Sequence, residues 1–450
     1  MPDAHGTSEV RLDAPALAIP AALPNRAGLP IRVRLWLVGL GVLAAGLVSS
    51  APAAAAPPVN PTVPAGFTIV RLAAAPGGAT NCDDLASLEG HLFMGCQNKT
   101  LSVGGGGSST LAEYTLSGML VKAWLVKDKI DGIGADPLNH RVIVTENEDG
   151  NSHLFTLTPS APAAQQIVNY TYVPDPRAPS APPALHTGGG TDNVSVDSSG
   201  HILITGSHAG TKTGTAVFKV VLTSPSSPGA TGTATLSPTF LDNATATNGK
   251  GSGTVKLTLG DVDSGTIVPA DSPRFGGTYV VADQTAQQLV FSSNIFNGSG
   301  LTVLKTPFGL DDLRWATSDA GTLYVVNNGG TVAGASAIYK VTGPFKKGTV
   351  LASNDGSGDQ VVTVNLTTGA LTPFVRHLTT TKGLVYLDAS GTESQLALNG
   401  AAAATSTASS SATPKKSGGS DDTAVIVIVI VAAVLLLGGF ALARRRRAAG

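Results

Sequence analysis

The chain has 450 residues, of which 13% are charged and 5% aromatic, and its formal net charge is −1. A protein that binds nucleic acid needs a basic face, whereas the clustered arginines of this chain stand at its C-terminal tail. Composition and charge therefore give no reason to expect a nucleic-acid partner.

The first feature along the chain is an apolar stretch behind basic residues. Arg26, Arg32 and Arg34 precede the apolar residues 35–48, and a run of small residues follows at 51–56. This order is typical of a secretory signal, so residues 1–56 are predicted to be a signal peptide. Cleavage after Ala53 or Ala56 fits the small-residue pattern, and an uncleaved first span is the alternative.

Residues 57–64 are rich in proline and are expected to be an extended lead-in. Residues 65–398 then carry the pattern of one folded domain. Short runs rich in Val, Ile, Thr and Tyr recur there between Gly, Asn, Asp and Pro, which predicts an all-β fold. The expected strands include residues 67–72, 92–95, 141–145, 201–205, 278–282, 322–327, 337–341 and 360–365.

The chain has two cysteines, Cys82 and Cys96. Between them lie two short apolar runs that are broken at Glu89-Gly90, where a hairpin can turn. In a hairpin around that turn the two cysteines face each other, so we predict a disulfide bond in an oxidising compartment. Two buried free thiols are the alternative.

The C-terminal part predicts attachment to a membrane. Residues 399–422 are rich in Ala, Ser, Thr and Gly without apolar periodicity, and are predicted to form a low-complexity, disordered stalk. Residues 423–443 are apolar or small, and the arginines 444–447 follow at once. At ~1.5 Å per residue this run spans roughly 30 Å, the thickness of a bilayer's hydrocarbon core.

We therefore expect one transmembrane helix at 423–443 and a basic cytoplasmic tail at 444–450. The protein would be a single-pass plasma-membrane protein with its main domain outside the cytoplasm. A buried helix of a soluble domain is the alternative reading of residues 423–443.

A loose repeat runs through the folded domain. Each copy begins with an acidic or amide residue before an apolar one, and then continues through a strand, a turn and a second strand. The copies start at residues 82–85, 131–133, 192–194, 261–263, 311–313 and, more weakly, 382–384. Six units of about 55 residues are typical of propeller blades, with an extra hairpin hidden in residues 192–260 as the main alternative. Closure is expected by pairing of residues 67–72 with the last strands after Lys382.

The clearest copies run from Asp192 to Gly206 and from Asp312 to Val326. They resemble the six-bladed β-propeller superfamily that holds the NHL-repeat proteins, the gluconolactonases and the paraoxonase-like arylesterases. In that superfamily a strand-leading Asp-Gly, Asn-Gly or Asp-Asn pair precedes a hairpin. The resemblance therefore implies that each clear copy forms a hairpin. The resemblance covers about 330 residues as architecture.

The resemblance also implies a metal site. In lactonase-like members, strand-leading carboxylates and amides converge on the central channel and hold one divalent cation, usually calcium, which polarises a lactone or ester carbonyl. The matching residues here are Asp84, Asp131, Asp192, Asn193 and Asp312. Asp and Asn also begin strands for a local reason, since their side chains cap turn amides. Turn capping is therefore the alternative to a shared calcium ion.

Other polar residues are also candidates for a site. His186 and His208 could act as general bases if they face the channel, although lone loop histidines are usually solvated. The acidic run 146–149 could bind surface calcium, although such runs are usually solvated turns.

Two functions follow from the sequence. The first is a cell-surface binding or scaffold module for an unknown extracellular ligand or protein. The second is an exported, calcium-dependent lactonase or esterase. The low aromatic content favours the first, because small-ligand pockets normally use more aromatic side chains.

Overall fold

The computed structural model describes residues 60–177, 190–207, 214–354 and 360–399. These residues form an all-β structure with two short 3-10 helices, at Pro137–Asn139 and Ala163–Gln165. The predicted signal peptide, stalk, transmembrane helix and basic tail lie outside the described residues, apart from Asn399. No helix within the described ranges is long and apolar enough to cross a membrane.

The strands that the sequence predicted are all present. In chain order they are β1 (Thr68–Ala74), β2 (Cys82–Leu88), β3 (His91–Cys96), β4 (Ser108–Thr115), β5 (Leu120–Lys127), β6 (Ile130–Asp136), β7 (Arg141–Glu146), β8 (His153–Leu157), β9 (Ile167–Pro174), β10 (Gly190–Val196), β11 (Ile202–Ser207), β12 (Thr215–Thr223) and β13 (Gly232–Leu241). The second half holds β14 (Thr245–Asn248), β15 (Thr254–Lys256), β16 (Ser264–Ile267), β17 (Tyr279–Asp283), β18 (Gln288–Asn294), β19 (Ser299–Lys305), β20 (Leu313–Trp315), β21 (Gly321–Asn327), β22 (Ala337–Gly343), β23 (Val350–Asn354), β24 (Gln360–Val364), β25 (Leu371–Val375) and β26 (Thr381–Asp388).

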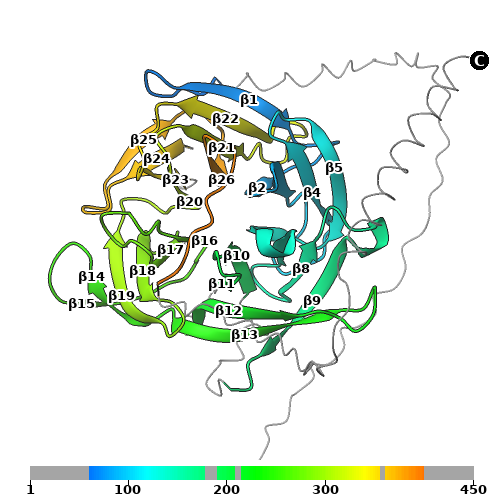
Figure 1. Ribbon diagram of the computed structural model, residues 1–450, viewed down its shortest axis with the longest axis horizontal. Helices are drawn as coiled ribbons and strands as arrows, with labels where there is room; N and C mark the ends of the chain where they lie inside the picture. Colours follow the sequence, from blue (N-terminus) through cyan, green and yellow to red (C-terminus); the bar gives the residue numbers. More distant parts are fainter. Residues whose placement is uncertain (1–59, 178–189, 208–213, 355–359, 400–450) are drawn as a thin grey trace, which may run out of the picture. The chain divides into compact units, whose positions relative to one another are not determined.

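The strands form groups of four with antiparallel pairing, which we number as units. Unit 1 is β2–β5, unit 2 is β6–β9, unit 3 is β10–β13, unit 4 is β16–β19, unit 5 is β20 with β23–β25, and unit 6 is β26 with β21, β22 and β1. Parallel pairing of β9 with β13 joins units 2 and 3 into one eight-stranded sheet. The first strands of the units lie next to one another around a central axis, which gives a propeller-like arrangement (Figure 1).

Apolar side chains fill the space between neighbouring units. Phe93 of unit 1 packs in one cluster with Ile133 of unit 2. The last unit packs on the first in the same way, because Val385 of unit 6 shares a cluster with Leu85 of unit 1. Alternating strand residues supply both faces of each sheet, so every unit is buried on two sides.

The predicted disulfide is confirmed, since Cys82 and Cys96 are bonded. They face each other across β2 and β3, and both are fully buried. The hairpin turns at Glu89-Gly90 as expected.

The prediction that residues 312–326 form a hairpin is wrong. β20 pairs with β23 in unit 5, whereas β21 pairs with β22 and β26 in unit 6. The chain therefore crosses from unit 5 to unit 6, returns to unit 5, and crosses again. The local pattern marks which residues form strands, but burial between distant segments decides which strands pair.

The predicted closing pair is also different. β1 lies in the same sheet as β26, but its direct partner is β22. An extra hairpin does occur within residues 192–260, formed by β14 and β15, and it extends unit 4 along β19.

Candidate functional site

Three of the inner strands are irregular where they begin. The pairing register shifts between Cys82 and Leu85 in β2, and the same shift occurs near the start of β6 and of β10. Each irregularity contains one of the pairs Asp83-Asp84, Asp131-Gly132 and Asp192-Asn193. A bulge of this kind breaks the strict alternation of a strand and re-aims its side chains.

The starts of all six units correspond to one another. The residue in the first position is acidic in five units and basic in the sixth: Asp83, Asp131, Asp192, Asp263, Asp311 and Lys382. The residue in the second position alternates between a carboxylate or amide and a small residue: Asp84, Gly132, Asn193, Ser264, Asp312 and Gly383. Odd-numbered units therefore carry the longer second residue.

The longer residues tie each odd unit to the next even unit. In every case a side-chain oxygen accepts a hydrogen bond from a backbone N–H near the start of the neighbouring inner strand. The pairs are Asp84 with Ile133, Asn193 with Gly265 at 3.1 Å, and Asp312 with Leu384 at 2.7 Å. These three residues therefore hold the ring of inner strands together.

The small second residues of the even-numbered units allow the backbone of a neighbouring unit to come close. A Cβ at Gly132 would lie 2.3 Å from the backbone oxygen of Asp192, and one at Gly383 would lie 2.5 Å from the backbone nitrogen of Leu85. A larger residue at either place would push the neighbouring unit away.

The inner strands surround a central channel, and their starts enclose one small cavity at one end of it. Its volume is about 20 Å³, which is room for an ion or a water molecule. Its lining consists of aspartates, an asparagine and a glycine: Asp83, Asp84, Asp131, Asp192, Asn193, Asp263, Asp311, Asp312 and Gly383. We call it the acidic cavity.

Basic side chains neutralise part of this acidic lining. Lys129 pairs with Asp131 at 2.9 Å, Lys382 with Asp311 at 3.3 Å, and Arg314 with Asp312 at 2.6 Å. Lys382 also lies 3.5 Å from Asp83. Among the described residues, no lysine or arginine forms an ion pair with Asp192 or Asp263.

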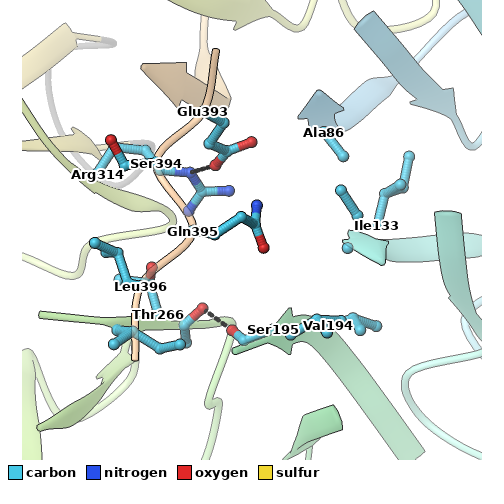
Figure 2. Close-up of a pocket in the computed structure, with 15 residues that line it drawn as sticks. Ala86, Ile133, Val194, Ser195, Thr266, Arg314, Glu393, Ser394, Gln395 and Leu396 are labelled. Carbon is cyan, nitrogen blue, oxygen red and sulfur yellow. Dashed lines mark hydrogen bonds and ion pairs between the residues drawn. The ribbon is translucent and has the colours of Figure 1, made fainter. Parts of the chain in front are cut away.

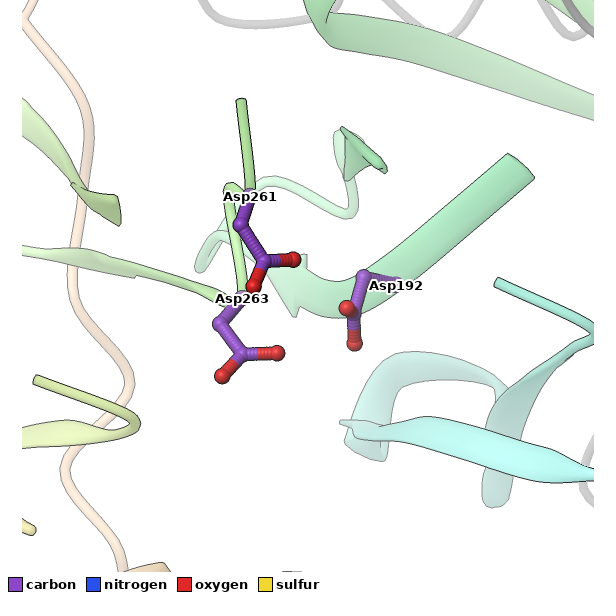
Figure 3. A group of neighbouring side chains, drawn as sticks. All are labelled: Asp192, Asp261 and Asp263. Carbon is purple, nitrogen blue, oxygen red and sulfur yellow. The ribbon is translucent and has the colours of Figure 1, made fainter. Parts of the chain in front are cut away.

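Asp192 and Asp263 lie together with a third carboxylate, Asp261. Asp192, Asp261 and Asp263 each place an oxygen within 4.8 Å of the others' (Figure 3). Asp192 is buried, and its Oδ2 has no hydrogen-bond partner in the described part of the chain. Burial, and then the charge of Asp131, raise the pKa of Asp192, while burial and the charge of Asp192 raise the pKa of Asp263.

This group fits a hard divalent cation. Calcium and magnesium prefer oxygen ligands, and a cation would neutralise carboxylates that otherwise repel one another. The orphaned Oδ2 of Asp192 is the atom that most needs a partner, because a buried unpaired acceptor is costly.

The structure brings the five predicted ligands to the acidic cavity. Asp84, Asn193 and Asp312 direct oxygens to backbone amides, Asp131 pairs with Lys129, and Asp192 belongs to the three-carboxylate group. Metal binding by these residues stays a prediction.

Sequence reasoning missed Asp261 and Asp263 as members of the group, although their Asp-Val-Asp sequence opens the fourth repeat copy. That spacing was the signal that could have found them. His186 and His208 lie outside the described residues.

The other end of the channel is covered by the chain itself. Residues 389–399 follow β26 and cross this end; we call them the C-terminal strap (Figure 1). Glu393 of the strap pairs with Arg314 at 3.8 Å (Figure 2). Leu396 accepts a hydrogen bond from the backbone N–H of Ser198 at 2.9 Å. A second cavity lies under the strap, lined by inner-strand residues that follow those of the acidic cavity in sequence.

No family model matches the chain, and no curated protein matches it. Solved structures that match include a streptogramin B lyase at 11% identity, covering 69% of this chain and 87% of that one with a TM-score of 0.35. Virginiamycin B lyase from Staphylococcus aureus matches at 8% identity, covering 66% and 85% with a TM-score of 0.34.

The PQQ-bound aldose sugar dehydrogenase from Streptomyces coelicolor matches at 9% identity, covering 62% and 99% with a TM-score of 0.32. At such identities and scores, these likenesses carry no argument about what this chain does.

Proposed function

We propose that this protein is a six-bladed propeller, each unit forming one blade, that acts as a surface binding module organised by a calcium ion at the acidic cavity. The observation that carries the proposal is the convergence of the strand-leading residues on one cavity. Seven aspartates line it, and the orphaned Oδ2 of Asp192 lies in a group of three carboxylates.

Asp192, Asp261 and Asp263 would hold the ion, which would supply fixed positive charge and cancel the repulsion among these side chains. The remaining residues form the frame. Asp84, Asn193 and Asp312 hold neighbouring inner strands together, so the position of the site is set by the rigid part of the fold. An extracellular protein partner would bind at this open end of the channel, because the C-terminal strap covers the other.

The predicted membrane attachment suits this arrangement. The strap leads directly into the predicted stalk and transmembrane helix, so the chain would leave the domain toward the membrane from the strap and not from the acidic cavity. Protease added to intact cells should release the domain, whereas a fully protected domain would show that it lies inside.

The second candidate function is a calcium-dependent lactonase or esterase of the gluconolactonase or paraoxonase type. It is favoured by the raised pKa values of the adjacent Asp192 and Asp263, since such carboxyl groups are frequent in active sites. A binding role is favoured over it because the cavity is too small for a lactone and its lining consists of Asp, Asn and Gly residues.

Calcium titration calorimetry tests the binding module. The chain should bind one calcium ion, and the double variant Asp192→Asn/Asp263→Asn should lose that binding. The exposed Asp271 and the half-buried Asp388 lie outside the acidic cavity and provide the matched control, since Asp271→Asn/Asp388→Asn should bind as the parent does. Equal calcium binding by the two double variants would contradict the site. Hydrolysis of simple lactones that needs both calcium and Asp192 would instead support the enzyme.

A further inference from the structure

A larger cavity lies away from the channel, in a lateral cleft between units 1 and 2. Its volume is about 420 Å³, within the usual range for small-molecule sites. One wall is the outer strand β5, and the other is formed by β8 and β9. The apolar part of the lining consists of Leu125, Val126, Phe155, Ile167 and Tyr170.

The polar part of the lateral cleft contains a histidine between two acidic residues. His153 Nε2 lies 2.8 Å from Glu146 and 3.9 Å from Asp128. Its Nδ1 lies 3.0 Å from the carbonyl oxygen of Asn151, so Nδ1 carries a proton. Glu146 is buried at the end of β7, so the expectation of a solvated turn is wrong for it, whereas Glu148 and Asp149 do form a turn and are half-buried.

Glu146 and His153 form a pair with no net charge, wherever their shared proton lies. Burial raises the pKa of Glu146. Burial alone would lower the pKa of His153, but its hydrogen bond to Glu146 and the charge of Glu146 raise it. The other charged residues of the lining are the buried Asp128 and the solvent-exposed Lys127.

Asp128 has one oxygen without a hydrogen bond. Its Oδ1 accepts a hydrogen bond from the backbone of Gly105 at 2.8 Å. Its Oδ2 lies 3.9 Å from both Lys127 Nζ and His153 Nε2, beyond hydrogen-bond distance, and the described residues supply no donor to it. Asp128 is only 7% exposed, while the Lys127 side chain is 88% exposed and extends into solvent.

We propose that the lateral cleft is a second binding site, which takes a small amphipathic amine. The ammonium group donates hydrogen bonds to Asp128 Oδ2, and the apolar body lies against Leu125, Phe155 and Ile167. A charged hydrogen bond to a buried carboxylate is stronger than a neutral one, which selects an amine over an alcohol of the same shape. A carboxylate ligand is disfavoured by the like charge of Asp128.

Phenethylamine is a suitable probe, with 2-phenylethanol and 3-phenylpropionate as its neutral and anionic counterparts. Titration monitored by NMR should show saturable binding of the amine at the cleft and none of the other two. Asp128→Asn should weaken the binding of phenethylamine by at least about tenfold. Asparagine tolerates the positive φ of 70° at this position, and its oxygen keeps the bond from Gly105.

Leu125→Lys provides a second variant that does not depend on Asp128→Asn folding well. Leu125 is 78% exposed, so the change leaves the core intact, and the new ammonium group competes for Asp128. This variant should also weaken binding, while the exposed control Asp271→Asn should not. Equal binding of the amine and the alcohol, or unchanged binding in both cleft variants, would overturn the proposal.

Discussion

The Asp84 carboxylate accepts a hydrogen bond from the backbone N–H of Ile133, and thereby joins the first strand of unit 1 to the first strand of unit 2. Its other oxygen accepts from the N–H of Leu85 at 2.7 Å. Asp312 of unit 5 makes the same two contacts, with Leu313 and Leu384. A residue predicted from sequence to be a metal ligand thus has a demonstrable structural role.

Replacement of Asp84 measures that role. Asp84→Ala leaves two buried N–H groups without an acceptor, so the free energy of unfolding should fall by about 2–4 kcal/mol. Asp84→Asn keeps one oxygen and should lose less. Urea denaturation measures both, with Asp271→Ala as an exposed control that costs about 0–1 kcal/mol. A loss for Asp84→Ala no larger than that of the control would show that this contact does not hold the units together.

The stability of the protein should depend on pH and calcium together. The pKa values of Asp84, Asp131, Asp192 and Asp263 lie above the ordinary 3.8 in the folded state, chiefly through burial. The folded state therefore keeps protons that the unfolded state releases, so stability falls as pH rises above about 4. Asp283, whose pKa burial raises to about 6, adds to this fall up to that pH.

Calcium should oppose the fall by binding the ionised carboxylates, with about 2.7 kcal/mol of stabilisation at a hundredfold excess over Kd. The melting temperature should therefore drop between pH 4 and pH 7 in chelator, and drop less in calcium. Differential scanning calorimetry checks this, and Asp192→Asn/Asp263→Asn should abolish the calcium effect. A calcium effect that is as large at pH 4 as at pH 7 would contradict carboxylate binding.

The sequence predicted those features of the fold that depend on local pattern. Strand positions follow from runs of β-branched residues, and the Cys82–Cys96 bond follows from a hairpin around one turn. The shared cavity followed from a repeat whose polar residue always stands at the start of a strand.

Features that depend on distant contacts were not predictable. Nothing local in residues 313–327 shows that β20 and β21 belong to different units. The alternation of long and small second residues can be explained only from the contacts between neighbouring units. Gly132, for example, has no room for a Cβ because the backbone of Asp192 lies against it. Grouping of Asp261 and Asp263 with Asp192 likewise depends on the approach of units 3 and 4.

The disulfide bond should contribute to stability through the unfolded state. It closes a loop of 14 residues in sequence separation, for which the chain-entropy model gives about 3 kcal/mol. Cys82→Ala/Cys96→Ala should lower the free energy of unfolding by that amount in urea. Protein purified without reductant should show no thiol that reacts with an alkylating reagent after unfolding, and two reactive thiols per chain would show that the bond does not form.

The C-terminal strap should be part of the folded domain rather than a loose exit to the predicted stalk. Leu398 is 6% exposed and lies in one apolar cluster with Val217 of unit 3 and Ile295 of unit 4. Asn399 adds a backbone hydrogen bond to Gly277 at 2.8 Å. The strap therefore connects the end of unit 6 to the opposite side of the ring.

Leu398→Ala should lower the free energy of unfolding by about 2–5 kcal/mol, because it removes a buried side chain and leaves a cavity. Leu138→Ala is the matched control, since Leu138 is 60% exposed and its loss should change stability by less than about 0.5 kcal/mol. Limited proteolysis should also cut the Leu398→Ala protein faster within residues 389–399, because a strap that detaches exposes its backbone to the protease. Equal stability and equal cleavage of the two variants would mean that the strap does not close the channel in solution, and ligands could then enter from either end.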